Sequence, residues 1–168
     1  DRDVTGVQTC ALPIFIDGRP VAGVVLAPAI GRLFVGEVGK GAFELTDQGT
    51  RTIAARAPSP DGLVAVASRS HPDRATGEFI ESLSIAERIS AGSSLKFCLV
   101  AEGRADLYPR FGPTMEWDVA AGHAIISAAG GVVVDGEGRP FRYGKDRFQS
   151  GAFVAFGREN LAHRLFAA

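Results

Sequence analysis

A single aspartate follows the only tryptophan of the chain and opens a stretch of small and apolar residues, WDVAAGHAIISAAG at 117–130. This stretch has the composition of a helix, and Asp118 at its start has two interpretations. A carboxylate there accepts hydrogen bonds from free backbone N–H groups and is stabilised by the helix dipole. It could instead face a metal ion and a phosphate, because small side chains at 120–122 would let other segments approach closely. Local sequence leaves both interpretations open.

A second stretch, GSSLK at 92–96, has the residue types of an anion site. Gly92 lets a ligand approach the backbone, and Ser93 leaves a free amide at the start of a predicted helix. Lys96 adds a positive charge within one turn. The alternative is a serine that caps the helix and a lysine in solvent.

A third stretch, SRSH at 68–71, follows LVAVA, an apolar run typical of a buried strand. Ligands of α/β sheets collect beyond the carboxyl ends of strands. Ser68, Arg69 and His71 are therefore candidates to hold a phosphate or a base, and an ordinary surface loop is the alternative.

The segment YPRFGPTMEWD at 108–118 contains two prolines, which stiffen an extended path. This path brings Arg110 and Asp118 towards one helix start. We expect Trp117 to be a core residue, Cys98 to be a buried thiol and His123 to be a packing or surface residue.

The elements that must position these residues change in character along the chain. Residues 15–55 alternate short apolar runs with tight turns, among them Asp17-Gly18, and predict an antiparallel meander. Residues 56–168 begin with a Pro-rich linker and then alternate strand and helix patterns, which predicts an α/β lobe with a mixed sheet. Residues 1–14 show neither pattern and resemble a translated sequencing-adapter remnant, so we expect a non-native or disordered leader there.

Composition excludes several classes of protein. The chain has 168 residues, 46% of them hydrophobic, and a formal net charge of −1, which gives no support to binding a nucleic-acid polymer. No apolar run is long enough to cross a bilayer. Two cysteines cannot form a disulfide framework, and a reducing cytoplasm is the simpler expectation.

The motif WDVAAG followed by ISAAGGVVVD resembles the C-terminal signature of the inositol-monophosphatase superfamily of Mg²⁺-dependent, lithium-sensitive phosphatases. SRSH, GSSLK and YPRFGPT narrow the resemblance, over about residues 15–168, to the bacterial CysQ family of 3′(2′),5′-bisphosphate nucleotidases. The resemblance implies a layered α/β sandwich, with a remnant antiparallel sheet followed by an α/β lobe. It also implies Mg²⁺ as cofactor and hydrolysis of adenosine 3′,5′-bisphosphate to AMP and phosphate, which removes a by-product of sulfate assimilation. A cytoplasmic location follows, with attachment to the inner-membrane surface left open.

Carried over motif by motif, the resemblance makes Asp118 the catalytic residue that binds both metal and substrate. It assigns nucleotide binding to Ser68, His71, Gly92, Ser93, Lys96 and Arg110.

The chain also departs from the family pattern. The family's other metal ligands lie in an E-E pair and in D-P-x-D-G-T, and neither motif occurs in this sequence. We therefore expect the C-terminal part of an enzyme, with negligible phosphatase activity by itself. Two alternatives remain: an inositol or sugar monophosphatase of the same superfamily, and a non-catalytic domain that binds nucleotide or phosphate.

Overall fold

The computed structural model describes residues 9–68 and 73–166. Its first half is an antiparallel sheet, sheet A, whose strands follow one another in the order β1-β2-β3-β4-β5, as the predicted meander requires. The strands are β1 (Cys10–Ile16), β2 (Arg19–Ala27), β3 (Arg32–Glu37), β4 (Gly41–Thr46) and β5 (Gly49–Ile53), with a 3₁₀ turn, η1 (Pro28–Ile30), between β2 and β3. Asp17 and Gly18 both have positive φ, 49° and 72°, as the predicted tight hairpin turn needs.

Sheet A begins earlier in the sequence than we predicted. Cys10 pairs with Leu26 and Ile14 pairs with Ala22, so residues 10–14 belong to a strand and the expectation of an unstructured leader is wrong for them. β1 is an edge strand, where a proline such as Pro13 is tolerated.

The second half contains a mixed sheet, sheet B, with the strand order β7-β6-β8-β10-β9. β6 is parallel to both of its neighbours, and β10 is antiparallel to β8 and β9, which confirms the predicted mixed sheet. The strands are β6 (Leu63–Ala67), β7 (Ile85–Ser90), β8 (Leu107–Arg110), β9 (Val132–Asp135) and β10 (Phe153–Phe156).

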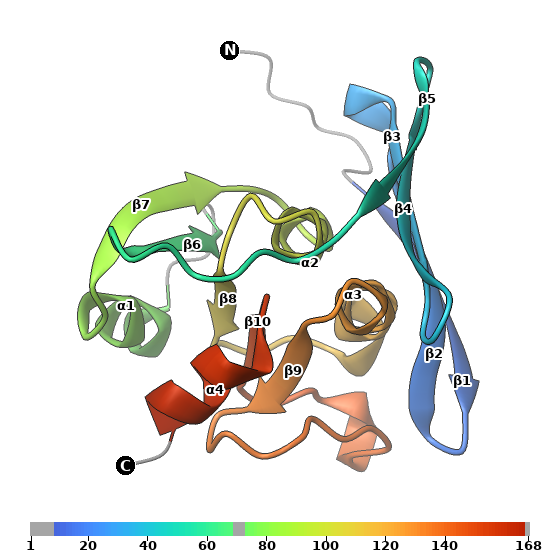
Figure 1. Cartoon of the computed structure of the whole chain (residues 1–168). Helices are drawn as coiled ribbons and strands as arrows, with labels where there is room; N and C mark the ends of the chain where they lie inside the picture. Colours follow the sequence, from blue (N-terminus) through green and yellow to red (C-terminus); the bar gives the residue numbers. More distant parts are fainter. Residues whose placement is uncertain (1–8, 69–72, 167–168) are drawn as a thin grey trace.

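Helices separate the two sheets and cover the far side of sheet B (Figure 1). The helices are α1 (Arg74–Glu81), α2 (Leu95–Ala101), α3 (Glu116–Ala128) and α4 (Glu159–Phe166), and a short 3₁₀ turn, η2 (Asp146–Phe148), precedes β10. Alternate residues of β6 point to opposite faces: Val64 and Val66 join the core with α2 and α3, whereas Leu63 and Ala65 pack with Leu161 of α4. The molecule is therefore a layered sandwich, as the family resemblance implied.

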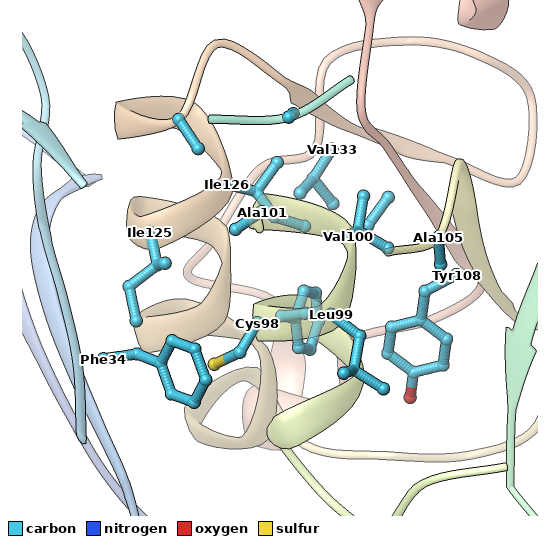
Figure 2. Close-up of a cluster of buried hydrophobic side chains, with 14 of the residues drawn as sticks. Phe34, Cys98, Leu99, Val100, Ala101, Ala105, Tyr108, Ile125, Ile126 and Val133 are labelled. Atoms are coloured by element: carbon cyan, nitrogen blue, oxygen red, sulfur yellow. The ribbon is translucent and has the colours of Figure 1, made fainter. Parts of the chain in front are cut away.

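The central core joins sheet A to sheet B through the two middle helices (Figure 2). Phe34 of β3 and Ile125 of α3 are fully buried, and Tyr108 of β8 is 3% exposed. Cys98 in α2 is fully buried, which confirms the predicted structural thiol, and burial raises its pKa well above the usual value.

Small residues let α3 approach its neighbours at backbone distance. A β carbon at Gly122 would lie 2.3 Å from Cγ of Phe97 in α2, and one at Gly23 would lie 2.3 Å from the carbonyl oxygen of Ala121. The AAG sequence at 120–122 is thus explained by close packing of α3 against α2 and β2.

A group of four charged side chains ties sheet A to the end of α2. Arg32 donates to Glu44 and, through Nη2, to Glu102 at 2.6 Å, and Arg51 also donates to both carboxylates. Burial would raise the pKa of Glu44, but the hydrogen bonds from Arg32 and Arg51 outweigh burial and lower it. These pairs hold the meander on the helical layer.

The face of sheet A that points away from α3 also carries apolar side chains. Leu12, Ile14 and Leu26 are 69%, 61% and 38% exposed on this face, whereas Val25 on the opposite face is fully buried. Strands β1 and β2 are therefore apolar on both faces.

Candidate functional site

Asp118 lies in the first turn of α3 and its side chain is exposed to solvent. Its Oδ2 accepts hydrogen bonds from Thr114 Oγ1 at 2.9 Å and from the backbone N–H of Met115 at 3.3 Å. The helix-cap interpretation is therefore correct. Because the carboxylate stays exposed, it also remains accessible to a ligand.

The GSSLK turn lies beside this helix start. Ser94 Oγ donates to the backbone oxygen of Asp118 at 3.5 Å, and Ser94 makes no side-chain cap bond to α2. The serine-cap alternative is thus wrong for Ser94. Ser93 precedes it with a positive φ of 43°, and its side chain is exposed.

Lys96 is buried, which contradicts the alternative of a lysine in solvent. The residue is 2% exposed; its Nζ donates to the carbonyl oxygen of Ala91 at 3.4 Å and lies 5.1 Å from the centroid of the Tyr108 ring. Within the described residues it forms no ion pair with a carboxylate. Burial, followed by the positive charge of Arg110, lowers the pKa of Lys96 to about 8.

A cavity of about 240 Å³ opens between the end of β6, the first turn of α1 and the end of β8. It brings together Ser68 and Arg110, two of the predicted site residues. Arg110 Nη2 donates to the carbonyl oxygen of Pro113 at 2.8 Å, and its buried Nε has no hydrogen-bond partner in the described parts of the chain. Among the described residues, the cavity is lined by Ser68, Asp73, Thr76, Tyr108, Pro109, Arg110, Gly112 and Pro113.

Lys96 adjoins this cavity through Tyr108, which is one of its walls and lies under the Lys96 ammonium group. Burial raises the pKa of Tyr108 to about 12, and Arg110 and Asp118 are among the charges that act on it. Lys96 and Arg110 are thus two cations that both act near Tyr108, and neither forms an ion pair with a carboxylate among the described residues.

Other predicted residues lie elsewhere. Gly92, Ser93 and Asp118 do not line the cavity, and His71 is outside the described residues. Glu116, in the same segment as Arg110 and Asp118, does not line the cavity either. Its carboxylate accepts hydrogen bonds from the backbone N–H groups of Gly144 and Lys145 at 2.9 and 3.0 Å.

The structure corrects one expectation about α3 and confirms another. Trp117 is 55% exposed, 6.2 Å from the ring of Phe148, so it is not a core residue; Val119 and Ala120 occupy the inner face of this turn instead. Of the two roles predicted for His123, packing is correct, with its Nδ1 2.9 Å from the hydroxyl of Tyr143. Burial lowers the pKa of His123 to about 4.

Sequence reasoning missed Asp73 and Thr76, which line the cavity from α1. Asp73 Oδ1 accepts the backbone N–H of Thr76 at 2.8 Å, as an N-cap residue does three positions ahead of its partner. The signal that could have found them is the aspartate three residues before a threonine at the start of a helix, which is the spacing of an N-cap.

The residues present do not make a complete Mg²⁺ site. No group of three or more His, Cys, Asp or Glu side chains able to hold a metal occurs among residues 9–68 and 73–166. Asp118 stands alone, and oxygen-rich Mg²⁺ sites need several ligands. The same residues contain no helix that is long and apolar enough to span a membrane.

Comparison with known proteins agrees with this architecture. The model of the inositol monophosphatase family matches residues 5–167. The chain belongs to the inositol monophosphatase family. Among curated members, the 3′(2′),5′-bisphosphate nucleotidase CysQ of Escherichia coli strain K12 is 45% identical over 139 residues, which are 82% of this chain and 55% of that protein. The CysQ of Buchnera aphidicola is 41% identical over 82% of this chain and 51% of its own length.

Solved structures of family members have the same fold. The crystal structure of CysQ from Bacteroides thetaiotaomicron superposes with a TM-score of 0.79 at 36% identity, covering 88% of this chain and 62% of that one. The inositol monophosphatase from Anabaena gives a TM-score of 0.74 at 26% identity, covering 95% of this chain and 63% of the other. The chain thus spans about half the length of the curated relatives it matches.

Proposed function

We propose that this chain carries the nucleotide-binding part of a 3′(2′),5′-bisphosphate nucleotidase, whose substrate is adenosine 3′,5′-bisphosphate. The observation that carries the proposal is the buried ammonium of Lys96, which forms no ion pair with a carboxylate among the described residues and lies next to the Tyr108 wall of a cavity that also holds Arg110. A buried charge without an opposite charge nearby is costly, and an anion in the site offsets that cost. The identity to proteins named as CysQ supports the same substrate.

Each of the proposed site residues has a role in nucleotide binding that follows from its position. Arg110 offers a fixed guanidinium fork, which suits phosphate oxygens, and the Ser68 hydroxyl lies across the same cavity. Lys96 contributes its charge over the Tyr108 ring, and Ser93 is exposed in the GSSLK turn. Asp118 lies beside this turn through its backbone contact with Ser94. His71 remains a prediction from the family resemblance.

In the complete enzyme, Mg²⁺ would supply activation of a water molecule and neutralisation of phosphate charge. Asp118 is the residue of this chain that would bind it. Since one carboxylate does not form such a site, we expect the chain alone to bind nucleotide without hydrolysing it. We expect this to occur in the cytoplasm, on the basis of the family resemblance.

A second candidate function is binding without turnover as the protein's only role. The observation that favours it is the lack of a three-ligand metal cluster among the described residues. In that case nucleotide binding should be independent of Mg²⁺ even when the upstream metal motifs of a relative are supplied on a separate chain.

Titration calorimetry of the purified chain tests the proposal. Adenosine 3′,5′-bisphosphate should bind more tightly than inositol 1-phosphate, because two phosphates face two cations. Lys96→Met should weaken nucleotide binding roughly tenfold or more, the scale of one lost charge-assisted hydrogen bond. Lys40→Met is the matched control, since Lys40 is an exposed lysine paired with Glu37 in the β3–β4 turn.

Two results would contradict the proposal. Equal affinity for inositol 1-phosphate and adenosine 3′,5′-bisphosphate would contradict the proposal that the nucleotide is the substrate. Release of inorganic phosphate from the nucleotide by this chain with Mg²⁺ would show that the expected inactivity is wrong.

A further inference from the structure

The first turn of α1 holds the loop that follows β8. We infer that Thr76 and Asp73 are positioning residues, which fix the guanidinium group of Arg110 where the nucleotide phosphate meets it. The inference rests on the proposed function, since that function supplies the ligand.

The hydroxyl of Thr76 is the link between the two segments. Thr76 is 9% exposed, and its Oγ1 donates to Asp73 Oδ2 at 2.6 Å. The same oxygen accepts the backbone N–H of Phe111 at 2.8 Å. Because the hydroxyl group of Thr76 donates its hydrogen bond to the carboxylate of Asp73, a lone pair of Oγ1 is free to accept the backbone N–H of Phe111. The residue after Arg110 is thus bonded to the helix that faces it across the cavity.

Two further contacts hold the same loop. A β carbon at Gly112 would lie 3.0 Å from Asp73 Oδ2, so glycine is what lets the loop pass the cap of α1. The ring of Phe111 packs on Phe79 of α1, with centroids 5.2 Å apart. Backbone and side chain of Phe111 are both fixed to α1.

The contacts of Phe111 and Gly112 with α1 fix the direction of the Arg110 side chain. Its Nη2 donates to the carbonyl oxygen of Pro113, which closes residues 110–113 into one turn, and its buried Nε has no hydrogen-bond partner among the described residues. A shift of Phe111 would turn the guanidinium within the cavity. A displacement of a ligand-binding group by about an ångström is enough to weaken its hydrogen bonds.

The test compares Thr76→Val with Thr76→Ser. Valine has nearly the same shape as threonine but can neither donate nor accept, whereas serine keeps the hydroxyl. Thr76→Val should weaken binding of adenosine 3′,5′-bisphosphate roughly tenfold, and Thr76→Ser should stay within about twofold of the wild type. Thr52→Val, at an exposed position of β5, is the matched control and should bind as the wild type does.

A double-mutant cycle with Arg110→Met separates positioning from general loss of structure. If Thr76 acts through Arg110, then Thr76→Val should add less than about twofold in an Arg110→Met background. Additive effects would overturn the inference.

Hydrogen exchange of the Phe111 amide gives a readout that needs no ligand. Thr76→Val should speed this exchange roughly tenfold, with little change at amides of sheet A. If the wild-type chain bound no nucleotide, the proposed function would fail, and exchange would still decide whether Thr76 holds the loop. Unchanged protection of Phe111 in Thr76→Val would overturn the inference by itself.

Discussion

Gly122 of α3 lies directly against the ring of Phe97 in α2. A β carbon at residue 122 would come within 2.3 Å of Cγ and 2.5 Å of Cδ2 of that ring. Phe97 is 2% exposed and also stacks on Phe153 of β10, with centroids 5.5 Å apart, so its ring has no free direction in which to move.

Gly122→Ala should therefore destabilise the chain by roughly 3 kcal/mol, the upper range for overpacking a core. Urea denaturation measures this change. Gly77→Ala is the matched control: Gly77 lies in α1 with nothing within 4 Å of its added β carbon, so alanine there should stabilise by up to about 1 kcal/mol. Equal effects at the two positions would contradict the packing explanation.

Lys96→Met should stabilise the chain at about pH 7, although it weakens nucleotide binding. The pKa of Lys96, lowered to about 8 from 10.5 mainly by burial, means that the unfolded state holds more protons between these values. The free energy of unfolding of the wild type should therefore rise with pH across that window. Below it, the lysine is charged in the folded state and the cost of burying that charge is fully present. We expect an advantage for the variant of up to about 3 kcal/mol at neutral pH.

That advantage should shrink towards about pH 10, as the lysine loses its charge in both states. Urea denaturation of both proteins across this range checks the trend. Lys40→Met should show no such dependence, because Lys40 is exposed. An advantage that grew with pH would show that the sign of the argument is wrong.

His123→Gln should remove part of the acid sensitivity of the chain. Burial lowers the pKa of His123 to about 4 from 6.5, so the unfolded state binds more protons between these values. Stability should therefore be lost as pH falls through this window, by up to about 3 kcal/mol.

Glutamine can still bond the Tyr143 hydroxyl but does not titrate there. The difference in Tm between wild type and His123→Gln, measured at several pH values from about 7 to about 4, checks this. His163→Gln, at an exposed position of α4, should keep the wild-type slope. An unchanged slope in His123→Gln would rule out His123 as the source.

Asp118→Ala should destabilise the chain by about 1 kcal/mol, because it removes the acceptor of the Thr114 and Met115 hydrogen bonds. Asp118→Asn keeps an acceptor in the same place and should cost less than half of that. Thermal denaturation compares the two. Asp146→Ala, at an exposed position of η2, should have no measurable effect, and an equal cost for all three variants would contradict the cap.

The strand and helix order could be predicted because each element has its own local signal. The Asp17-Gly18 turn, the apolar run of β6 and the glycines after α3 act over a few residues. β1 escaped prediction for a physical reason. Leu12 and Ile14 are exposed on one face of a strand pair that is apolar on both, so alternation was lost and only pairing with β2 reveals the strand.

The site was predicted less completely, because distant contacts decide its details. Ser68 and Arg110 share a cavity that Gly92 and Asp118 do not line, and the burial of Lys96 depends on Tyr108 and on the packing of α2. Trp117 looked like a core residue by type, and the direction of the first turn of α3 left it exposed. The local sequence does not indicate which way the first turn of α3 faces.

The contacts of Gly23, Gly36 and Gly122 with their neighbours leave α3 no room to shift towards sheet A or α2. In a library of random variants, these three positions should tolerate no larger residue, whereas neighbouring exposed positions of sheet A should accept many. The boundary between tolerant and intolerant positions would then trace the path of α3 across the sheet, and sequencing of surviving clones would reveal it without a structure.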